Sequence, residues 1–320
     1  YDAKGEPLGK VSAPNVSPYL AAGPDAVVKN RSKPISTVPE MAFGNMPNDG
    51  GNLLLNNEDR ETLLAECPAA APFVRELISA DQFLNGEKRW CLWLVDASPS
   101  EIRKLNPIQT RVAAVKEVRS ASKRATTREL AKYPRLFGEI RQPKTRYLCV
   151  PCHSSEKRTY IPIGFLDHSK IVNNSCLALE SATLYHFGVL HSEMHMAWVR
   201  QICGRIKSDY RYSARLVYNN FPWPAEVSDK QREAVEAAAQ AVLDARAQFP
   251  MASLADLYDP LSMPKQLRKA HTALDRAVDR CYRSQPFPDE RRRFEYLFEM
   301  WETLERPLAW PAKKKRARRR

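Results

Sequence analysis

Several features are missing from this 320-residue sequence, and each absence excludes a class of protein. No apolar run approaches the roughly 20 residues that a membrane-spanning helix requires. Glycine supplies only 11 residues, and no glycine-rich loop of the kinds that hold S-adenosylmethionine or phosphate groups is present. A spaced Asp/Glu/Lys cluster typical of a nuclease is missing too. We therefore predict no catalytic and no cofactor-binding residues in this chain.

Cysteine is sparse and follows no framework pattern. The seven cysteines are an odd number at irregular spacings. This distribution favours free thiols in a reducing compartment, so we expect a cytoplasmic protein. The sequence begins with Tyr1, and no signal-like apolar segment follows. We interpret it as a fragment or processed product whose N-terminal partner region is missing.

Positive charge is concentrated in the middle of the chain. The formal net charge is +13. Residues 111–225 hold 19 Lys and Arg against 8 Asp and Glu, whereas the segments on either side are slightly acidic. Residues 313–320 add seven further cations. A central block of one sign is better evidence for a polyanionic partner than a high pI alone.

The apolar patterns predict an α+β architecture with a helical C-terminal part. Helices are expected at about 57–66, 69–79, 107–130 and 192–203, with a short one capped by Ser98. Short β-like runs are expected at 90–95, 147–150, 158–163, 177–179 and 184–190. Further helices are predicted at 229–247, 252–258, 263–281 and 288–304.

These patterns also predict the domain organisation. We expect an extended Pro-, Gly- and Asn-rich connector over 1–52, a mixed domain over 53–224, a small helical domain over 225–306 and a disordered basic tail over 307–320. No internal repeat is evident.

Residues 204–224 are the most informative segment. Their sequence is Gly-Arg-Ile-Lys-Ser-Asp-Tyr-Arg-Tyr-Ser-Ala-Arg-Leu-Val-Tyr-Asn-Asn-Phe-Pro-Trp-Pro. Cationic side chains can bind phosphates. Guanidinium and amide groups can hydrogen-bond to base edges, and aromatic rings can stack on bases. A solvated charged surface is the alternative, but charge alone would not require the aromatic residues. We therefore predict nucleic-acid contact.

Two sets of contacts follow from this prediction. The side chains expected to read base edges are Arg141, Gln142, Ser154, Ser155, Lys207, Ser208, Asp209 and Arg211. Asp209 could accept a hydrogen bond from cytosine N4, or it could orient Arg211. The side chains expected to hold phosphates or stack are Lys116, Arg119, Lys123, Arg124, Arg128, Arg135, Lys144, Arg146, Lys157, Arg158, Arg205, Tyr210 and Tyr212.

Two patterns resemble metal sites only in part. Cys149-Val150-Pro151-Cys152-His153 has the spacing of half a zinc site, but no second pair lies at a useful distance and a structural zinc needs four ligands. His191 and His195 lie one helical turn apart, yet Glu193 is off their shared face. Small buried residues at a strand end and a helix start with partly buried histidines are simpler interpretations. We predict no metal ligands.

The segment Asn220-Phe221-Pro222-Trp223 is similar to the Asn-Pro-Pro-aromatic loop of amino-methyltransferases. In that loop the Asn side chain and the backbone accept hydrogen bonds from the target amine. Phe221 replaces the first proline and changes the backbone. We interpret the segment as a packed hinge.

Taken together, the motifs resemble one family, the MmeI-like (Type IIL) single-chain restriction–modification enzymes, over roughly residues 15–305. The segments that carry the resemblance occur in the expected order: Asp49-Gly50-Gly51-Asn52-Leu53, Arg89-Trp90-Cys91-Leu92-Trp93-Leu94, Phe137-Gly138-Glu139-Ile140-Arg141-Gln142-Pro143, Tyr160-Ile161-Pro162-Ile163-Gly164-Phe165, Met194-His195-Met196-Ala197-Trp198-Val199-Arg200, Cys203-Gly204-Arg205, Ser208-Asp209-Tyr210-Arg211-Tyr212-Ser213 and Tyr218-Asn219-Asn220-Phe221-Pro222-Trp223-Pro224.

The resemblance implies a target-recognition domain, similar to those of Type I specificity subunits, followed by the family's C-terminal helical domain. It implies sequence-specific recognition of double-stranded DNA, with base-reading residues in the region 208–212. It places S-adenosylmethionine-dependent methylation of adenine N6, and any Mg²⁺-dependent nuclease, in missing lobes of the same polypeptide. The alternative is an RNA-binding or assembly module without sequence readout.

Overall fold

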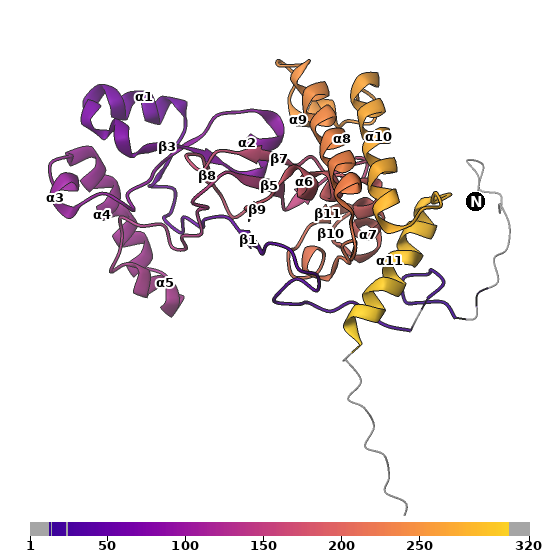
Figure 1. Cartoon of the computed structure of the whole chain (residues 1–320). Coiled ribbons are helices and arrows are strands. Elements are labelled where there is room, and N and C mark those ends of the chain that lie inside the picture. The colour runs from indigo at the N-terminus through magenta and orange to yellow at the C-terminus, as the bar shows by residue number, and fades with distance from the viewer. Residues whose placement is uncertain (1–12, 14, 24, 307–320) are drawn as a thin grey trace, which may run out of the picture.

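The computed structural model describes residues 13, 15–23 and 25–306. The predicted basic tail and the first 12 residues of the predicted connector lie outside the described residues. Figure 1 shows an elongated molecule, with α1, α3, α4 and α5 at one end and α8, α10 and α11 at the other. The strands lie between these two groups of helices, so the predicted α+β architecture is confirmed.

The first lobe is built on a four-stranded sheet of order β2–β4–β3–β8. Its strands are β2 (Leu54–Leu55), β3 (Val74–Ile78), β4 (Trp90–Leu92) and β8 (Ile171–Val172). The flanking helices are α1 (Asn57–Glu66), the 3₁₀ helix η1 (Pro68–Phe73), α2 (Ala80–Asn85), α3 (Pro99–Ile102), α4 (Asn106–Ser120) and α5 (Ala125–Leu130). Ser98 caps α3 as predicted, because its side chain accepts a hydrogen bond from Glu101 N.

The central sheet has the order β1–β9–β5–β7 and is antiparallel throughout. It contains β1 (Met41–Phe43), β5 (Tyr147–Pro151), β7 (Gly164–Leu166) and β9 (Cys176–Glu180). All five residues of β5 are buried, as expected for an inner strand covered on both faces. A third, small sheet has the order β10–β11–β6, from β6 (His153–Ser154), β10 (Gly204–Ile206) and β11 (Asp209–Arg211).

Helices form the other end of the molecule. They are α6 (Leu184–Leu190), α7 (Glu193–Ile202), α8 (Asp229–Ala247), α9 (Leu254–Leu257), α10 (Lys265–Tyr282) and α11 (Glu290–Glu305), with a 3₁₀ turn, η2 (Tyr218–Asn220). The predicted helix over 229–247 is confirmed at both ends, and a capping box of Ser228 and Gln231 starts it. Among the described residues, no helix is both long and apolar enough to cross a membrane.

Three predicted elements are wrong, and each has a physical reason. Residues 69–79 are η1 followed by strand β3, because Pro72 has no N–H to extend a helix. Residues 158–163 form no strand, because Pro162 cannot donate to a ladder. Residues 184–190 form helix α6, where a side chain at Gly188 would meet Val235 of α8 at 2.7 Å. Tertiary packing overrides their β propensity.

The predicted basic helix over 107–130 is two helices, α4 and α5. Ser122 Oγ accepts a hydrogen bond from Arg124 N, and this local turn competes with helix continuation. The guanidinium of Arg128 then donates to the carbonyls of Ser122 and Lys123. Arg124 and Arg128 are therefore not on the face of α4 that carries Lys116.

Part of the predicted connector lies against the C-terminal half of the same chain. Ile35 N donates to Asn219 O at 2.7 Å, and Asn220 Nδ2 donates to Lys29 O at 2.9 Å. Farther back, Ala22 N donates to Glu295 of α11. Figure 1 shows this segment passing beneath the C-terminal helices toward β1. It therefore links the two ends of the molecule.

Arg119 is a structural residue, which corrects its predicted role as a phosphate contact. Its side chain is 1% exposed, so it cannot reach a nucleic acid. All five of its N–H groups donate to main-chain carbonyls, at 2.7–3.1 Å, on the residues Pro47, Asn48, Leu130, Tyr133 and Leu136. Burial lowers the pKa of the guanidinium from its ordinary value.

Replacing Arg119 by Met should be strongly destabilising. The substitution leaves five carbonyls without their donor, and we expect a loss of about 3–5 kcal/mol in the free energy of unfolding. Urea unfolding of the purified chain measures this loss. Lys116→Met on the same helix is the matched control, since its exposed side chain should change stability by less than about 0.5 kcal/mol. Equal stability of the two variants would contradict the structural role.

A buried polar contact joins α10 to the mixed domain. Asp275 accepts hydrogen bonds from Tyr160 Oη and Glu193 N, both at 2.7 Å. Tyr160 also stacks on His271 of α10, with ring centroids 4.0 Å apart. Burial raises the pKa of Asp275 to about 7. The folded state therefore retains a proton on this carboxyl that the unfolded chain releases near pH 4.

This protonation predicts a pH dependence of stability. Because the native state binds the additional proton between about pH 4 and 7, the free energy of unfolding should fall as pH rises through that window. The Asp275 contribution should fall by at most about 1.4 kcal/mol per pH unit and level off above pH 7. Urea unfolding of wild type and Asp275→Asn at pH 5 and pH 8 isolates it. An identical pH dependence in both proteins would contradict the prediction.

Candidate nucleic-acid interface

The centre of the candidate interface is the hairpin of β10 and β11. The strands pair antiparallel, with Gly204 opposite Arg211 and Ile206 opposite Asp209. The two-residue turn places Lys207 at a φ of 54°, in the left-handed region. Strand β6 joins the other edge of β11, with His153 opposite Arg211. The sheet thus holds Arg211 between two neighbouring strands.

Strand alternation decides which side chains of the hairpin reach solvent. Successive residues point to opposite faces of a strand, so Asp209 and Arg211 are exposed whereas Tyr210 and Tyr212 are buried. Tyr212 Oη hydrogen-bonds to His195 Nε2 at 2.9 Å inside the core. The predicted stacking roles of both tyrosines are corrected for this reason.

The same alternation removes another predicted base contact. Ser154 lies opposite Tyr210 and is 4% exposed, so it points into the protein. Arg205 lies across from Tyr210, and its guanidinium packs over that ring at 4.1 Å. Arg205 Nη1 also donates to Ser208 O at 2.9 Å. Arg205 therefore supports the hairpin turn, although its side chain remains partly exposed.

Asp209 has a defined structural partner. Its Oδ1 accepts a hydrogen bond from Glu156 N at 3.2 Å, which ties the hairpin to the turn after β6. Ser155 and Lys157 belong to that turn, and Lys157 is exposed. One carboxylate oxygen of Asp209 is thus engaged within the protein. No hydrogen bond between Asp209 and Arg211 is formed, so orientation of Arg211 by Asp209 is not supported.

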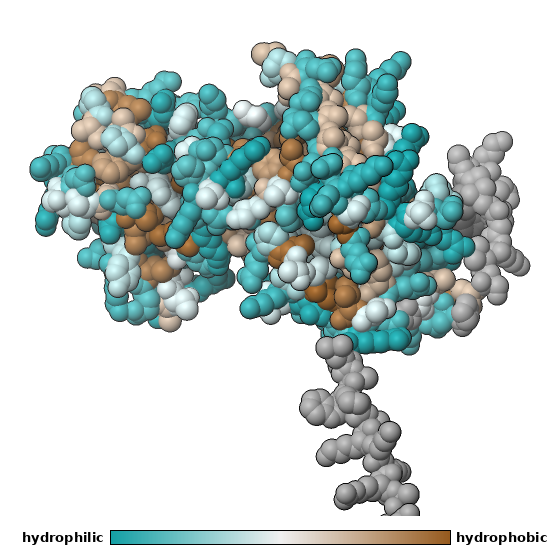
Figure 2. All heavy atoms as spheres, viewed as in Figure 1, coloured by the Kyte–Doolittle hydropathy of each residue, from teal (hydrophilic) through white to brown (hydrophobic). Residues whose placement is uncertain are grey.

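A groove of about 550 Å³ lies beside the hairpin. Residues far apart in the sequence line it: Asn30, Phe43, Met46, Glu139, Arg141, Cys152, His153, Asn174, Ser175, Gly204, Arg211, Tyr212, Ser213 and Leu216. It brings Arg141 and Arg211 together, as the sequence-based prediction requires. The space-filling view shows an indentation between the two lobes along the lower margin of the molecule (Figure 2).

A buried amide network positions Arg141. Asn45 is fully buried, and its Oδ1 accepts a hydrogen bond from Arg141 N at 2.7 Å. Asn45 Nδ2 donates to Gln142 Oε1 at 2.8 Å, and Gln142 Nε2 donates to the carbonyls of His168 and Lys170. The amide of Gln142 is therefore engaged inside the protein and cannot also read adenine, which corrects that prediction. Arg141 itself is exposed and forms an ion pair with Glu139.

The predicted phosphate contacts divide by location. Lys116, Lys123 and Arg124 are exposed on α4 and on the turn before α5. Arg135 instead donates to the carbonyls of Leu94 and Ala97, at 2.7 and 3.0 Å. Its predicted phosphate role is corrected, because these contacts tie it to the first lobe.

Other predicted contacts lie away from the groove. Lys144 and Arg146 are exposed just before β5 and do not line the groove, although Arg141, three residues before Lys144, does. Arg146 packs over Phe165 at 4.2 Å but remains exposed. Arg158 is half-buried, and this burial lowers the pKa of its guanidinium.

The partial motifs have structural explanations. Cys149 and Cys152 are buried, and burial raises the pKa of the Cys152 thiol to about 12, whereas His153 faces outward. Within the described residues, no group of three or more His, Cys, Asp and Glu could hold a metal ion. Asn220 is 1% exposed and donates to three carbonyls, so the resemblance of its segment to a methyltransferase loop is superficial.

The sequence analysis missed several groove residues. His153 was considered only as a metal ligand, and Asn174, Ser175 and Ser213 were not selected. Asn45 was missed as the residue that positions Arg141. Their segments meet only through the central sheet, and no local pattern distinguishes them from ordinary loop residues. Only His153 could have been identified, because successive strand residues face opposite sides and His153 therefore points away from the side that Ser154 faces.

Known proteins resemble the chain over nearly its full length. Residues 22–225 match the family model described as MmeI, target recognition domain, and residues 227–309 match MmeI, C-terminal domain. DNA methyltransferase A of Bacillus subtilis (strain 168) is 39% identical over 290 residues, which cover 91% of this chain and 33% of that protein.

A solved structure is also similar. It is the Type IIL restriction–modification enzyme MmeI in complex with DNA, with 43% identity and a TM-score of 0.88. The similarity covers 94% of this chain and 40% of that chain. The chain thus spans a third of the curated relative and two-fifths of the solved enzyme.

The amide network predicts the effect of Gln142→Leu. The change removes one of the two acceptors of Asn45 Nδ2, which keeps Val172 O, and it leaves Val172 N without an acceptor. The free energy of unfolding should fall by about 1–3 kcal/mol. Urea unfolding measures this loss. Gln201→Leu, at an exposed position of α7, is the matched control and should shift stability by less than about 0.5 kcal/mol. Wild-type stability of Gln142→Leu would show that the network is not required.

Proposed function

The chain belongs to the family of the MmeI target recognition domain, and on this basis we propose that it reads a specific sequence of double-stranded DNA. The observation that carries the proposal is the convergence of Arg141 and Arg211 on one groove. A guanidinium can form two hydrogen bonds with the O6 and N7 atoms of guanine in the major groove. The relative of known structure was solved in complex with DNA.

The hairpin is the proposed base-reading element. A two-stranded ribbon fits the major groove of B-form DNA. Lys207, Ser208 and Asp209 form its exposed tip, and Arg211 projects beside it into the groove. Among the described residues, no hydrogen bond or ion pair engages the guanidinium of Arg211. That donor fork is therefore available to a base edge.

Phosphate contacts are proposed for the exposed cations around this groove. Lys116, Lys123 and Arg124 extend from the first lobe, and Lys157 extends from the turn after β6. Such contacts bind all sequences alike and set the register of the protein on the duplex. Arg205 and Arg158 are proposed to support the hairpin and the adjoining turn, and Ser155 remains a candidate base contact.

The chemistry is proposed to belong to the longer protein. The curated relative is named a DNA methyltransferase, and this chain spans a third of it. We propose that the remaining part binds S-adenosylmethionine and methylates adenine N6, and that any Mg²⁺-dependent cleavage also takes place there. The target adenine would leave the stack to reach that part. The present chain would then supply specificity.

Arg211→Ala and Lys123→Ala should have different effects on DNA binding. If Arg211 reads guanine, its loss should cost about 1–3 kcal/mol and relax one base position. Loss of Lys123 should weaken all sequences alike and lower the slope of log K against log salt by about one. Selection from a random duplex pool, followed by titration of the selected site at several salt concentrations, measures both effects.

The outcomes are separable. An equal loss of affinity for all sequences in Arg211→Ala would contradict its readout role. If the wild-type chain enriched no motif and bound RNA as tightly as DNA, the chain would instead be an RNA-binding or assembly module. Circular dichroism melting of both variants shows whether they remain folded, so a loss of binding can be assigned to the contact.

A further inference from the structure

The outer face of the three-stranded sheet carries one apolar side chain among polar ones. Residues directly opposite each other on antiparallel strands project to the same face. Gly204 lies opposite Arg211 on one side, and His153 lies opposite it on the other. Ile206 lies opposite Asp209. Within this described set Ile206 is the only apolar side chain, and it is 44% exposed.

This face is also the one that adjoins the candidate groove. Arg211 and His153 both line the groove, so the side chains that share their face point toward the same partner. Ile206 stands at the end of β10, directly before the exposed turn of the hairpin. A partner that contacts Arg211 and the turn would therefore cover Ile206 as well.

Packing inside the protein does not account for Ile206. Its strand neighbour Arg205 covers the buried ring of Tyr210, so Ile206 points to the opposite side of the sheet. Among the described residues, Ile206 belongs to no apolar core cluster and packs against none. Its apolar surface gains free energy only when a ligand removes it from water. Strand propensity of a β-branched residue is the alternative explanation, and it predicts no role in binding.

We propose that Ile206 contacts the C5 methyl group of a thymine in the recognised DNA sequence. The major groove presents hydrogen-bond donors, acceptors and the thymine methyl, and apolar side chains recognise thymine through that methyl group. An isoleucine between polar neighbours supplies this apolar contact, while the polar neighbours are left for donors and acceptors. Thymine recognition by Ile206 rests on the proposed function, because it assigns one base within the sequence that the hairpin would read.

The register of the hairpin also predicts where this thymine lies. Ile206 and Arg211 are diagonal neighbours on one face, and side chains in that relation start about 7–8 Å apart. Successive base pairs of a DNA duplex are about 3.4 Å apart. If Arg211 reads a guanine, the thymine should lie within about three base pairs of that guanine.

Replacement of single thymines by deoxyuridine tests the contact, because it removes only the methyl group and keeps the base pair. The full chain is titrated with duplexes of the selected site in which one thymine at a time is replaced. At one position near the base read by Arg211, wild-type affinity should fall about fourfold, the factor expected for one buried methyl group. The same replacement should have no effect on Ile206→Ala. Met251→Ala is the matched control and should show the wild-type loss, since Met251 is 96% exposed and outside the groove.

The outcomes distinguish this contact from the proposed function. If the chain enriches a motif but tolerates deoxyuridine at every thymine, DNA reading stands and the methyl contact is overturned. An equal deoxyuridine effect in wild type and Ile206→Ala assigns the methyl to another residue, which also overturns it. If the chain enriches no motif, the proposed function fails and the contact fails with it.

A second variant keeps the test decisive if Ile206→Ala does not fold. Ile206→Val retains the branched side chain and the strand propensity but lacks the terminal methyl group of Cδ1. Its deoxyuridine effect should be smaller than that of wild type. An unchanged deoxyuridine effect in Ile206→Val would overturn the proposal.

Discussion

The buried guanidinium of Arg119 is the interaction on which the candidate interface depends. It brings together the turn at Pro47 and Asn48, the helix α4 that carries it, and the segment that follows α5. That segment continues to Glu139, which pairs with Met46, and then to the amides of Gln142 and Asn45. Arg141 faces the groove because both ends of this connection are held by main-chain carbonyls and amides. The guanidinium of Arg119, which was predicted to bind a phosphate, instead helps to position the guanidinium of Arg141.

The hairpin of β10 and β11 also divides its side chains between structural support and exposure to solvent. An alternating strand has only half of its side chains available for a ligand, so Arg211 and Asp209 face outward while Tyr210 and Tyr212 join the core. Of these two tyrosines, Tyr212 links the segment after β11 to α7 through its hydrogen bond with His195. Arg205 lies over Tyr210, and Asp209 holds the neighbouring turn. The exposed groups are thus presented by a rigid support, which reduces the entropy lost when they bind a partner.

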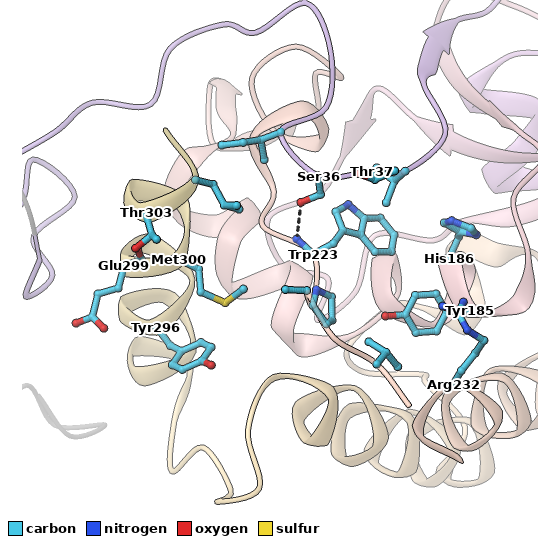
Figure 3. A pocket seen from close by; sticks show the side chains of 16 residues that line it. Ser36, Thr37, Tyr185, His186, Trp223, Arg232, Tyr296, Glu299, Met300 and Thr303 are labelled. Carbon is cyan, nitrogen blue, oxygen red and sulfur yellow. Dashed lines mark hydrogen bonds between the residues drawn. The ribbon is translucent and has the colours of Figure 1, made fainter. Parts of the chain in front are cut away.

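The two halves of the chain are interdependent. The connector before β1 bonds to residues near Asn219 and to α11, and Asp275 of α10 accepts from Tyr160 and from the start of α7. A cavity of about 810 Å³, lined by Tyr185 and Trp223 on one side and by Tyr296 of α11 on the other, lies between the same two halves (Figure 3). The proposed function requires a fixed orientation of the recognition surface, because the reacting base would be modified in another part of a longer protein. The polar contacts between these halves provide it, because their directions are specific where apolar packing is not.

Much of the organisation was determined by the sequence itself. Apolar spacing and capping residues determined helices such as α8, because they depend on neighbours within a few residues. The central block of charge and the ordered motifs indicated the family and a DNA partner. Only the tertiary structure decided which charged and polar groups are free. Four polar side chains predicted to contact DNA are instead engaged or buried inside the protein: Arg119, Arg135, Gln142 and Ser154. Hydrogen bonds to main-chain carbonyls hold the first three, and strand alternation turns Ser154 inward. Asn174 and Arg211 line one groove, and Asn45 bonds to the main chain of both Asn174 and Arg141. These residues are far apart in the sequence, and no local pattern contains that information.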